Sequence, residues 1–195
     1  MSLTFEVLSG DAITDALDDL ARLRIAVFAE WPYLYDGDMD YERKYVATYR
    51  DAEEAILVAA KDGDRIVGVA TGTPMEDHAD DFAAPFAVTG IPLAEIFYCA
   101  ESVLLPEYRG QGAGHAFFDA REAKARALGR KYAAFCGVMR PADHPDRPKG
   151  YRPLDAFWTK RGYKKLDGVV ARFRWKDHRD TEQTEKPLQF WMREL

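Results

Sequence analysis

The amino-acid sequence predicts a mixed α/β fold, in which a central twisted sheet of parallel and antiparallel strands is flanked by helices. Three observations indicate it. Segments with strand-like and helix-like hydrophobic spacing alternate along the 195 residues. Residues 95–138 read as strand, glycine-rich turn, helix and strand, an order that needs a parallel crossover. Residues 55–73 read as two strands joined by Asp62-Gly63-Asp64, which is typical of an antiparallel hairpin.

The remaining elements follow from the same spacing and from the positions of proline and glycine. Hydrophobic periodicity predicts helices over 11–29, 40–50, 115–129 and 155–162. It predicts strands over 3–8, 95–105, 131–138, 163–175 and 187–194. Residues 74–92 contain three prolines and a glycine, so an irregular connection is expected there.

Length and composition predict one soluble domain over residues 1–195. No repeat, low-complexity tract or linker divides the chain, and no apolar run approaches the ~20 residues of a membrane span. A net charge of −6 gives no reason to expect nucleic-acid binding. Cys99 and Cys136 are far apart in apolar contexts, which favours reduced thiols and a cytoplasmic protein.

The most informative segment is Arg109-Gly110-Gln111-Gly112-Ala113-Gly114, which stands between a predicted strand and a predicted helix. Glycine permits positive φ and brings a ligand close to the backbone. The start of a helix offers unpaired N–H groups that suit a pyrophosphate. A purely structural helix-entry turn is the alternative. The Rossmann and P-loop patterns both fail on spacing.

This hexapeptide resembles the (Arg/Gln)-x-x-Gly-x-(Gly/Ala) signature of the Gcn5-related N-acetyltransferases (GNAT), with Arg109, Gly112 and Gly114 in the signature positions. The later Phe157-Trp158-Thr-Lys-Arg-Gly-Tyr is similar to the second signature of that family. The hairpin at 55–73 resembles its second and third strands, so the resemblance covers roughly residues 53–166.

The resemblance implies acetyl-coenzyme A as cosubstrate, with no metal and no covalent acyl-enzyme. It implies a bulged central strand whose residues Ser102, Val103, Leu104 and Leu105 pair with the pantetheine, while residues 109–114 hold the pyrophosphate. A backbone N–H near Val103 or Leu104 is then expected to stabilise the oxyanion. Phe157 and Trp158 are expected to pack in the core and to wall the pantetheine.

An alkyl ammonium must lose a proton before it attacks, and a positioned carboxylate favours this. Glu101 is the first candidate for that role and Glu95 the second, because strand alternation over 95–105 puts both on one face. The alternative for Glu101 is a structural pair with an arginine. Many relatives use a tyrosine as the general acid where this chain has Trp158, so Tyr151, Tyr163 or water remains open for that role.

Two segments are expected to shape the acceptor pocket. Tyr33, Tyr35 and Asp36 belong to an aromatic and acidic stretch, followed by Asp38 and Glu42, that suits an amine cation. The alternative is a capping loop in which Asp38 or Asp40 begins the next helix. In the long loop 139–153, Arg140 and Tyr151 are candidates for contact with the acceptor.

These observations favour an N-acetyltransferase that acts on the primary amine of a small cationic or zwitterionic metabolite. Two alternatives stay open: a catalytically weak module that binds or senses acyl-coenzyme A, and an acetyltransferase for protein lysines or N-termini. The C-terminal segment is expected to close the sheet as a charged-tip hairpin, and its edge makes a homodimer possible.

Overall fold

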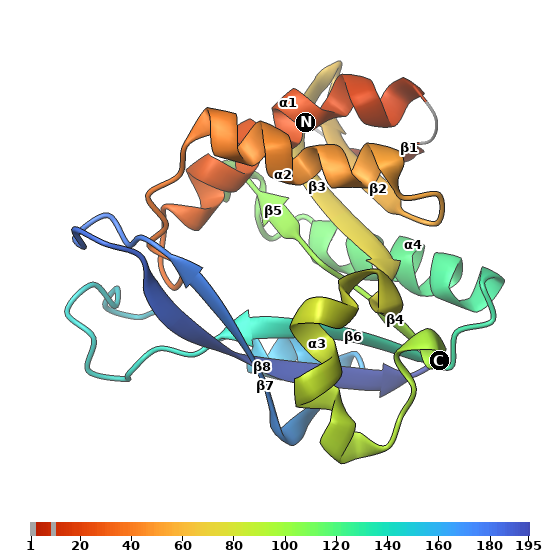
Figure 1. Ribbon diagram of the computed structural model, residues 1–195. Coiled ribbons are helices and arrows are strands. Elements are labelled where there is room, and N and C mark those ends of the chain that lie inside the picture. Colours follow the sequence, from red (N-terminus) through yellow and green to blue (C-terminus); the bar gives the residue numbers. More distant parts are fainter. Residues whose placement is uncertain (1–2, 9–10) are drawn as a thin grey trace.

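A computed structural model of the protein describes residues 3–8 and 11–195 (Figure 1). The described strands form one mixed sheet in the order β1-β2-β3-β4-β6-β8-β7, and β5 pairs with β3 beside β4. The strands are β1 (Thr4–Leu8), β2 (Ile56–Asp62), β3 (Arg65–Pro74), β4 (Ile96–Tyr98), β5 (Ser102–Leu104), β6 (Tyr132–Val138), β7 (Lys164–Trp175) and β8 (Thr184–Glu194). The pairing of β4 with β6 is parallel, as the sequence predicts, and the hairpin of β2 and β3 is antiparallel.

Helices cover both faces of the sheet. The helices are α1 (Asp11–Phe28), α2 (Met39–Asp51), α3 (Ala79–Phe86), α4 (Ala113–Ala127) and α5 (Asp155–Lys160). On one face, α1 and α2 pack over β1–β3, and α3 packs over β6–β8 (Figure 1). On the opposite face, α4 and α5 cover the middle of the sheet. On the face that carries α2 and α3, the two helices stand apart over β3 and β4 (Figure 1), and we refer to this region between them as the groove; the hollow in it is a cavity at the end of α2 and the end of β3.

Sequence-local signals explain most element boundaries. The N-cap of α2 is Asp38, whose Oδ1 accepts a hydrogen bond from the Tyr41 N–H at 2.9 Å, so the capping-loop alternative describes this end of the loop correctly. The Asp62–Arg65 turn contains Gly63 at φ 60°, a conformation that favours glycine. Both cysteines are free thiols, with Cys99 buried and Cys136 half-buried. Of the helices in the described residues, none has the length and apolarity to cross a bilayer.

The strand expected over 95–105 is divided into β4 and β5, at the bulge that the family resemblance implies. A bulge separates β4 from β5, because the Ala100 N–H donates to the Thr71 carbonyl while the Thr71 N–H donates to the Glu101 carbonyl. Two residues thus face one on β3, and the strand bends. Arg121 of α4, which is 1% exposed, donates from Nη1 to the carbonyls of Thr71 and Glu101 at 3.2 and 3.0 Å, and it holds the bulge from the other face.

One further expectation needs correction. Residues 74–92 contain the helix α3 in spite of Pro85, because Phe82 and Phe86 bury their rings against β8. The C-terminal hairpin closes the sheet as expected: β8 lies between β6 and β7, and β7 forms the edge.

Candidate active site

The central strands separate beyond the bulge. The last hydrogen bond between them runs from the Cys99 N–H to the Ala134 carbonyl at 2.8 Å, and from Ser102 onward β5 pairs only with β3. The Leu105 N–H bonds Val67 and the Glu101 carbonyl bonds Thr71, so the alternation of an antiparallel ladder directs the Val103 backbone groups toward β3. The N–H groups of Ser102 and Leu104 then point to the open side, toward the diverging β6.

The glycine turn stands at the wide end of this opening. Gly110 and Gly112 have φ of 80° and 84°, and Gly112 is the N-cap of α4. The backbone N–H groups of residues 110–114 have no hydrogen-bond acceptor among the described residues. Together with the positive end of the α4 dipole, they form a site suited to a diphosphate. Arg109 itself pairs with Glu30 at the end of α1, at 2.9 Å.

The two aromatic residues of the second signature lie on the α4 side of the sheet. A Cβ at Gly114 would come within 3.2 Å of the Phe157 ring, and a Cβ at Gly137 within 3.2 Å of the Trp158 ring. Trp158 also packs against Phe135 and Trp191. Both rings therefore pack in the core. Trp158 packs against Phe135 and Gly137 of β6, in the part of this strand that diverges from β4. Their contact with the pantetheine stays a prediction.

The comparisons with known proteins fit this geometry. The model of the acetyltransferase (GNAT) family matches residues 20–148. The chain belongs to this family. A search by sequence among curated proteins found no match.

Solved GNAT structures resemble the chain over its whole length, at low sequence identity. A GCN5-related N-acetyltransferase from Kribbella flavida is 15% identical, with a TM-score of 0.61 over 100% of this chain and 98% of that one. The PaiA N-acetyltransferase from Thermoplasma acidophilum, in complex with coenzyme A, is 14% identical, with a TM-score of 0.56 over 100% of both. A Salmonella typhimurium protein that holds acetyl-CoA as its cofactor is 10% identical, with a TM-score of 0.61 over 100% and 95%. At these identities the likeness shows the fold.

In this GNAT domain the carboxylate of Glu101 is buried at the bulge and surrounded by donors. Arg24 Nη1 lies 2.5 Å and the Tyr45 hydroxyl 2.9 Å from Oε1. The hydroxyls of Tyr49 and Thr71 bond Oε2. Burial alone would raise the pKa of Glu101, but Arg24 and the three hydroxyls outweigh it and lower the pKa below its ordinary value. A carboxylate whose oxygens already accept four hydrogen bonds and whose pKa is lowered is a poor proton acceptor. The geometry therefore favours the structural alternative for Glu101.

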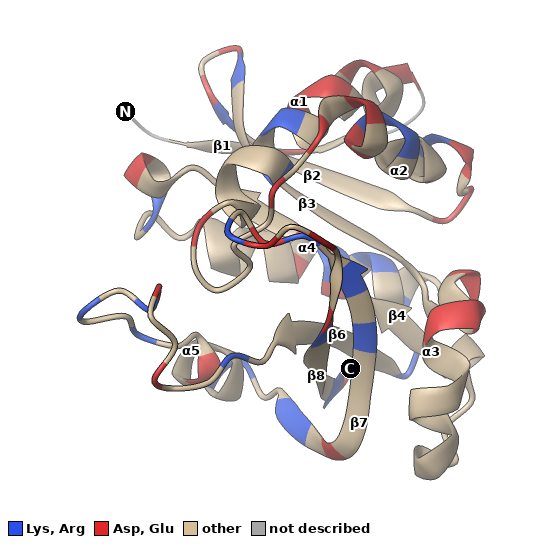
Figure 2. Cartoon of the chain, turned by 60° about the vertical axis from the view of Figure 1, so that its left-hand side comes forward, with Lys and Arg blue, Asp and Glu red and all other residues tan. Residues whose placement is uncertain are grey.

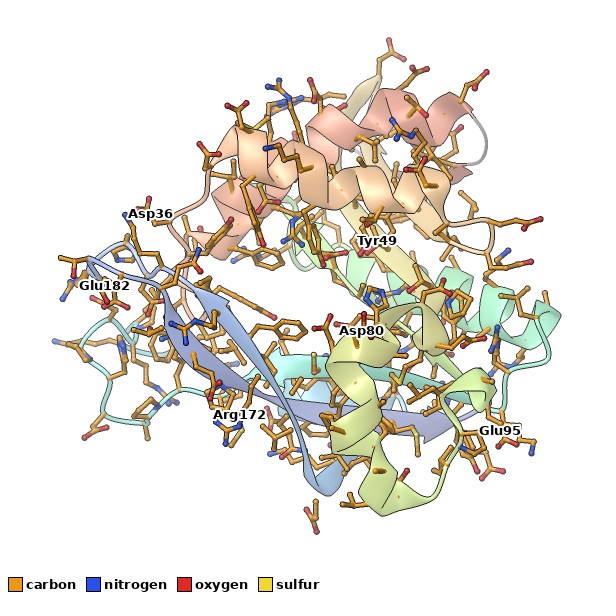
Figure 3. All side chains as sticks on the ribbon, in the orientation of Figure 1. Asp36, Tyr49, Asp80, Glu95, Arg172 and Glu182 are labelled. Atoms are coloured by element: carbon orange, nitrogen blue, oxygen red, sulfur yellow. The ribbon has the colours of Figure 1, made fainter. Side chains whose placement is uncertain are left out.

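Glu95 lies away from this cluster. The expectation that it shares a strand face with Glu101 is wrong, because Glu95 ends a 3₁₀ turn before β4 and the bulge interrupts the alternation. Its carboxylate pairs with Lys131 at 2.7 Å. Figure 3 shows Glu95 at the end of the sheet opposite to Asp36.

The loop with Tyr33, Tyr35 and Asp36 bridges one end of the groove. The Asp36 N–H donates to the Lys176 carbonyl and the His178 N–H to the Leu34 carbonyl, both at 2.9 Å, so this loop joins the β7–β8 connection. Asp36 also pairs with Lys176. Burial raises the pKa of Tyr33, and burial together with nearby Glu42 raises that of Tyr35. These side chains border the bridged end, and their contact with an acceptor stays a prediction.

Arg140 occupies a structural position at the same end. Its side chain is 9% exposed and pairs with Asp177 through Nη1 at 2.7 Å and Nη2 at 3.0 Å. It also donates to the carbonyls of Pro32 and Tyr33. These partners use all three guanidinium nitrogens and four of the five N–H donors, so the geometry favours a structural role for Arg140. Tyr151 packs edge-on against Trp31, beside the bridged end.

The opposite end of the groove opens into a cavity of about 720 Å³ that sequence reasoning missed. It lies between the end of α2, residues 52–54 and the end of β3, where Figure 3 shows Tyr49 and Asp80 from the two sides. Tyr45 and Tyr49, the partners of Glu101, reach its inner wall. Its other lining residues are mainly polar: Thr48, Asp51, Ala52, Glu53, Glu54, Thr73, Pro74, Glu76, Asp77, His78 and Arg130.

Of the tyrosines considered as general acid, Tyr163 is separated from the opening. Tyr163 is 1% exposed and donates to Glu122 on the α4 side. A different tyrosine, Tyr98 of β4, places its hydroxyl 3.5 Å from the Cys136 Sγ on the groove side, where β6 starts to diverge. Burial raises the pKa of Tyr98 well above its ordinary value and that of Cys136 to about 12. Both groups are therefore protonated at neutral pH.

Proposed function

We propose that the protein is an N-acetyltransferase that transfers the acetyl group of acetyl-coenzyme A directly to the primary amine of a small cationic or zwitterionic metabolite. One observation carries this proposal: the open backbone edge of β5 runs toward the five unpaired amides of residues 110–114. An extended arm that ends in a diphosphate is complementary to this arrangement, since the strand edge suits the pantetheine and the amides suit the phosphates.

The residues present fit such a donor. The N–H groups of Ser102 and Leu104 both point to the open edge, so they are the donors placed to hold the thioester carbonyl and its developing negative charge. Val103 and Leu104 are the two residues expected to supply the oxyanion donor. The antiparallel ladder directs the Val103 N–H to β3, so of these two only Leu104 has an N–H on the open side. When bound, acetyl-coenzyme A supplies the activated acetyl group, and the chain contributes orientation and the oxyanion donor.

The charge of the groove supports a cationic acceptor. Five of the residues that line the cavity are acidic, namely Asp51, Glu53, Glu54, Glu76 and Asp77, against one arginine, Arg130. Figure 2 shows acidic residues at the start of α3 and residues of both charges along α2, while Lys and Arg follow β7. Burial and the neighbouring Glu76 raise the pKa of Asp77, which is the response of a carboxyl in a crowded acidic site. An ammonium is attracted to such a surface.

Calorimetric titration with acetyl-coenzyme A, beside coenzyme A and NAD, tests the donor. We expect micromolar binding of both coenzyme A forms and none of NAD. A screen of mono- and diamines for thiol release from acetyl-coenzyme A then tests the acceptor, with neutral alcohols as the comparison. Absence of binding to the fresh, reduced protein would refute the proposed donor. Release only with peptide lysines or peptide N-termini would refute the proposed acceptor class.

A further inference from the structure

The proposed reaction needs a proton acceptor, and Glu101 does not provide one. An alkyl ammonium with a pKa near 10.4 is about three pK units from its reactive form at pH 7.5, roughly 4 kcal/mol. Glu101 accepts hydrogen bonds from Arg24 and three hydroxyls, and its pKa is lowered. We propose that His78, held at the floor of the acidic cavity, accepts the proton of the acceptor ammonium. This proposal rests on the proposed function.

The chain holds the His78 imidazole on three sides. Its Nε2 lies 3.0 Å from Thr73 Oγ1. The ring packs against Phe82 of α3, with centroids 5.6 Å apart, and edge-on against Tyr98 of β4, at 5.2 Å. Residues of β3, α3 and β4 therefore fix the ring, which is the usual requirement for a group that exchanges protons at a defined place.

The other ring nitrogen is available. His78 is the N-cap residue of α3, yet its side chain makes no capping hydrogen bond, and no described residue bonds its Nδ1. In the tautomer that the proposal assigns, the Nε2–H donates to Thr73 Oγ1, so that the lone pair lies on Nδ1. The residue is half-buried and lines the cavity, so an ammonium that enters the cavity reaches the imidazole.

The imidazole and the bulge border the same cavity. Thr71 and Thr73 are two residues apart on β3, so their side chains share one face at a spacing of about 7 Å. Thr71 bonds Glu101 at the bulge, and Thr73 bonds His78. Tyr98, opposite Thr73, extends from His78 to Cys136 where β6 diverges. Tyr45 and Tyr49, which bond Glu101, line the cavity together with His78. An amine that enters this cavity therefore passes the imidazole beside the bulge.

The proposed transfer is balanced in atoms and in charge. The ammonium gives one proton to His78 Nδ1, which becomes an imidazolium. The freed nitrogen lone pair forms a C–N bond with the acetyl carbonyl carbon, and the C–S bond breaks with its electron pair on the coenzyme A sulfur. The second proton of the nitrogen passes through water to that thiolate, and His78 returns its proton to solvent. The sum is an N-acetyl amine, free coenzyme A and one proton.

Other titratable groups face the same space and bear on its pH dependence. Tyr98 faces the ring from β4, and the charged or titratable groups that line the cavity with it are Tyr45, Tyr49, Asp51, Glu53, Glu54, Glu76, Asp77 and Arg130. Of these groups, Arg130 pairs with Glu76 at 2.7 Å.

The test compares His78→Asn with His178→Asn. Asparagine is a favourable N-cap, so the first variant preserves the start of α3. His178 is exposed in the β7–β8 connection, which makes the second a matched control. The rate of thiol release from acetyl-coenzyme A is measured with 1,5-diaminopentane from pH 6 to 9. For His78→Asn we expect about a 100-fold loss in kcat/KM near pH 7. We also expect the rate to increase with pH over a higher pH range than in the wild type.

Acetyl-coenzyme A binding, measured by calorimetry, separates the possible failures. Unchanged binding with the altered pH profile supports His78 as the proton acceptor. If His78→Asn and His78→Gln both bind acetyl-coenzyme A normally and keep the wild-type pH profile, the role of His78 is refuted and the proposed function stands. A wild-type protein that binds no acetyl-coenzyme A, or that releases no thiol with the diamine above the water rate, overturns the proposed function and the role of His78 with it.

Discussion

Arg24 Nη1 lies 2.5 Å from Glu101 Oε1, and the two side chains are only 11% and 6% exposed. The same guanidinium donates through Nε to Glu42, which is fully buried. One arginine of α1 thus compensates two buried carboxylates, one on α2 and one at the bulge. Cation–π contacts with Phe28 and Tyr45 hold the guanidinium in place. The ion cluster ties both helices to the strand that bends.

Replacing Arg24 by methionine is expected to lower the free energy of unfolding by about 3–5 kcal/mol, because two buried carboxylates lose their counter-ion. Urea denaturation at pH 7 measures the change. Arg172→Met is the matched control, since its pair with Glu185 is about half exposed and such a pair contributes less than about 1 kcal/mol. Equal losses in the two variants would show that the buried cluster does not stabilise the fold.

Glu101 is also expected to make the protein sensitive to acid. Its folded-state pKa is lowered, because Arg24 and the surrounding hydroxyls outweigh the effect of burial. A lowered pKa contributes stability that is present above the unfolded-state value, about 4.3, and is lost as pH falls through the folded-state value. Urea denaturation between pH 7 and 3 should therefore show falling stability below about pH 5. Glu101→Gln should flatten this dependence, and an unchanged slope would contradict the assignment.

The sequence predicts the parts of this molecule that local signals determine. Asp62-Gly63-Asp64 marks the hairpin because a short turn at positive φ needs glycine. The glycines of 109–114 mark the start of α4 for the same reason. The parallel crossover follows from the strand, turn, helix and strand order, which permits few topologies.

The features that the sequence leaves unpredicted depend on contacts between distant segments. The family resemblance implies a bulge in the central strand, but its position at Ala100 and Glu101 is fixed by Thr71 across the sheet and by Arg121 from α4. The role of Glu101 depends on Arg24, which lies 77 positions away. The cavity around His78 arises only when α2 and the end of β3 come together.

Arg140 is expected to affect stability and not acceptor binding. Arg140→Ala removes the pair with Asp177 and the bonds to two loop carbonyls, so the Asp177 carboxylate, 10% exposed, keeps only its contact with Lys186 as an ion pair at 3.2 Å. We expect a loss of about 3 kcal/mol in unfolding free energy. Thermal and urea unfolding measure it, with the exposed Arg152→Ala as control. A raised KM for the amine with unchanged stability would instead place Arg140 in the acceptor site.

Gly112→Asp is expected to weaken acetyl-coenzyme A binding without unfolding the protein. Gly112 has φ 84°, and no heavy atom lies within 4 Å of a Cβ built there, so the new carboxylate has room but stands among the amides proposed to bind the pyrophosphate. Repulsion between like charges should reduce the affinity at least tenfold, about 1.4 kcal/mol, as measured by calorimetric titration.

Gly63→Asp is the matched control for this variant. It introduces the same side chain at a glycine with φ 60° and open space around its Cβ, in the hairpin turn between β2 and β3. Both variants carry a similar backbone strain and the same added charge, so a difference in affinity between them reports the local role of the α4 turn. If both variants are folded by circular dichroism and bind acetyl-coenzyme A with equal affinity, the glycines of 109–114 serve only to start the helix. The diphosphate would then bind at another site.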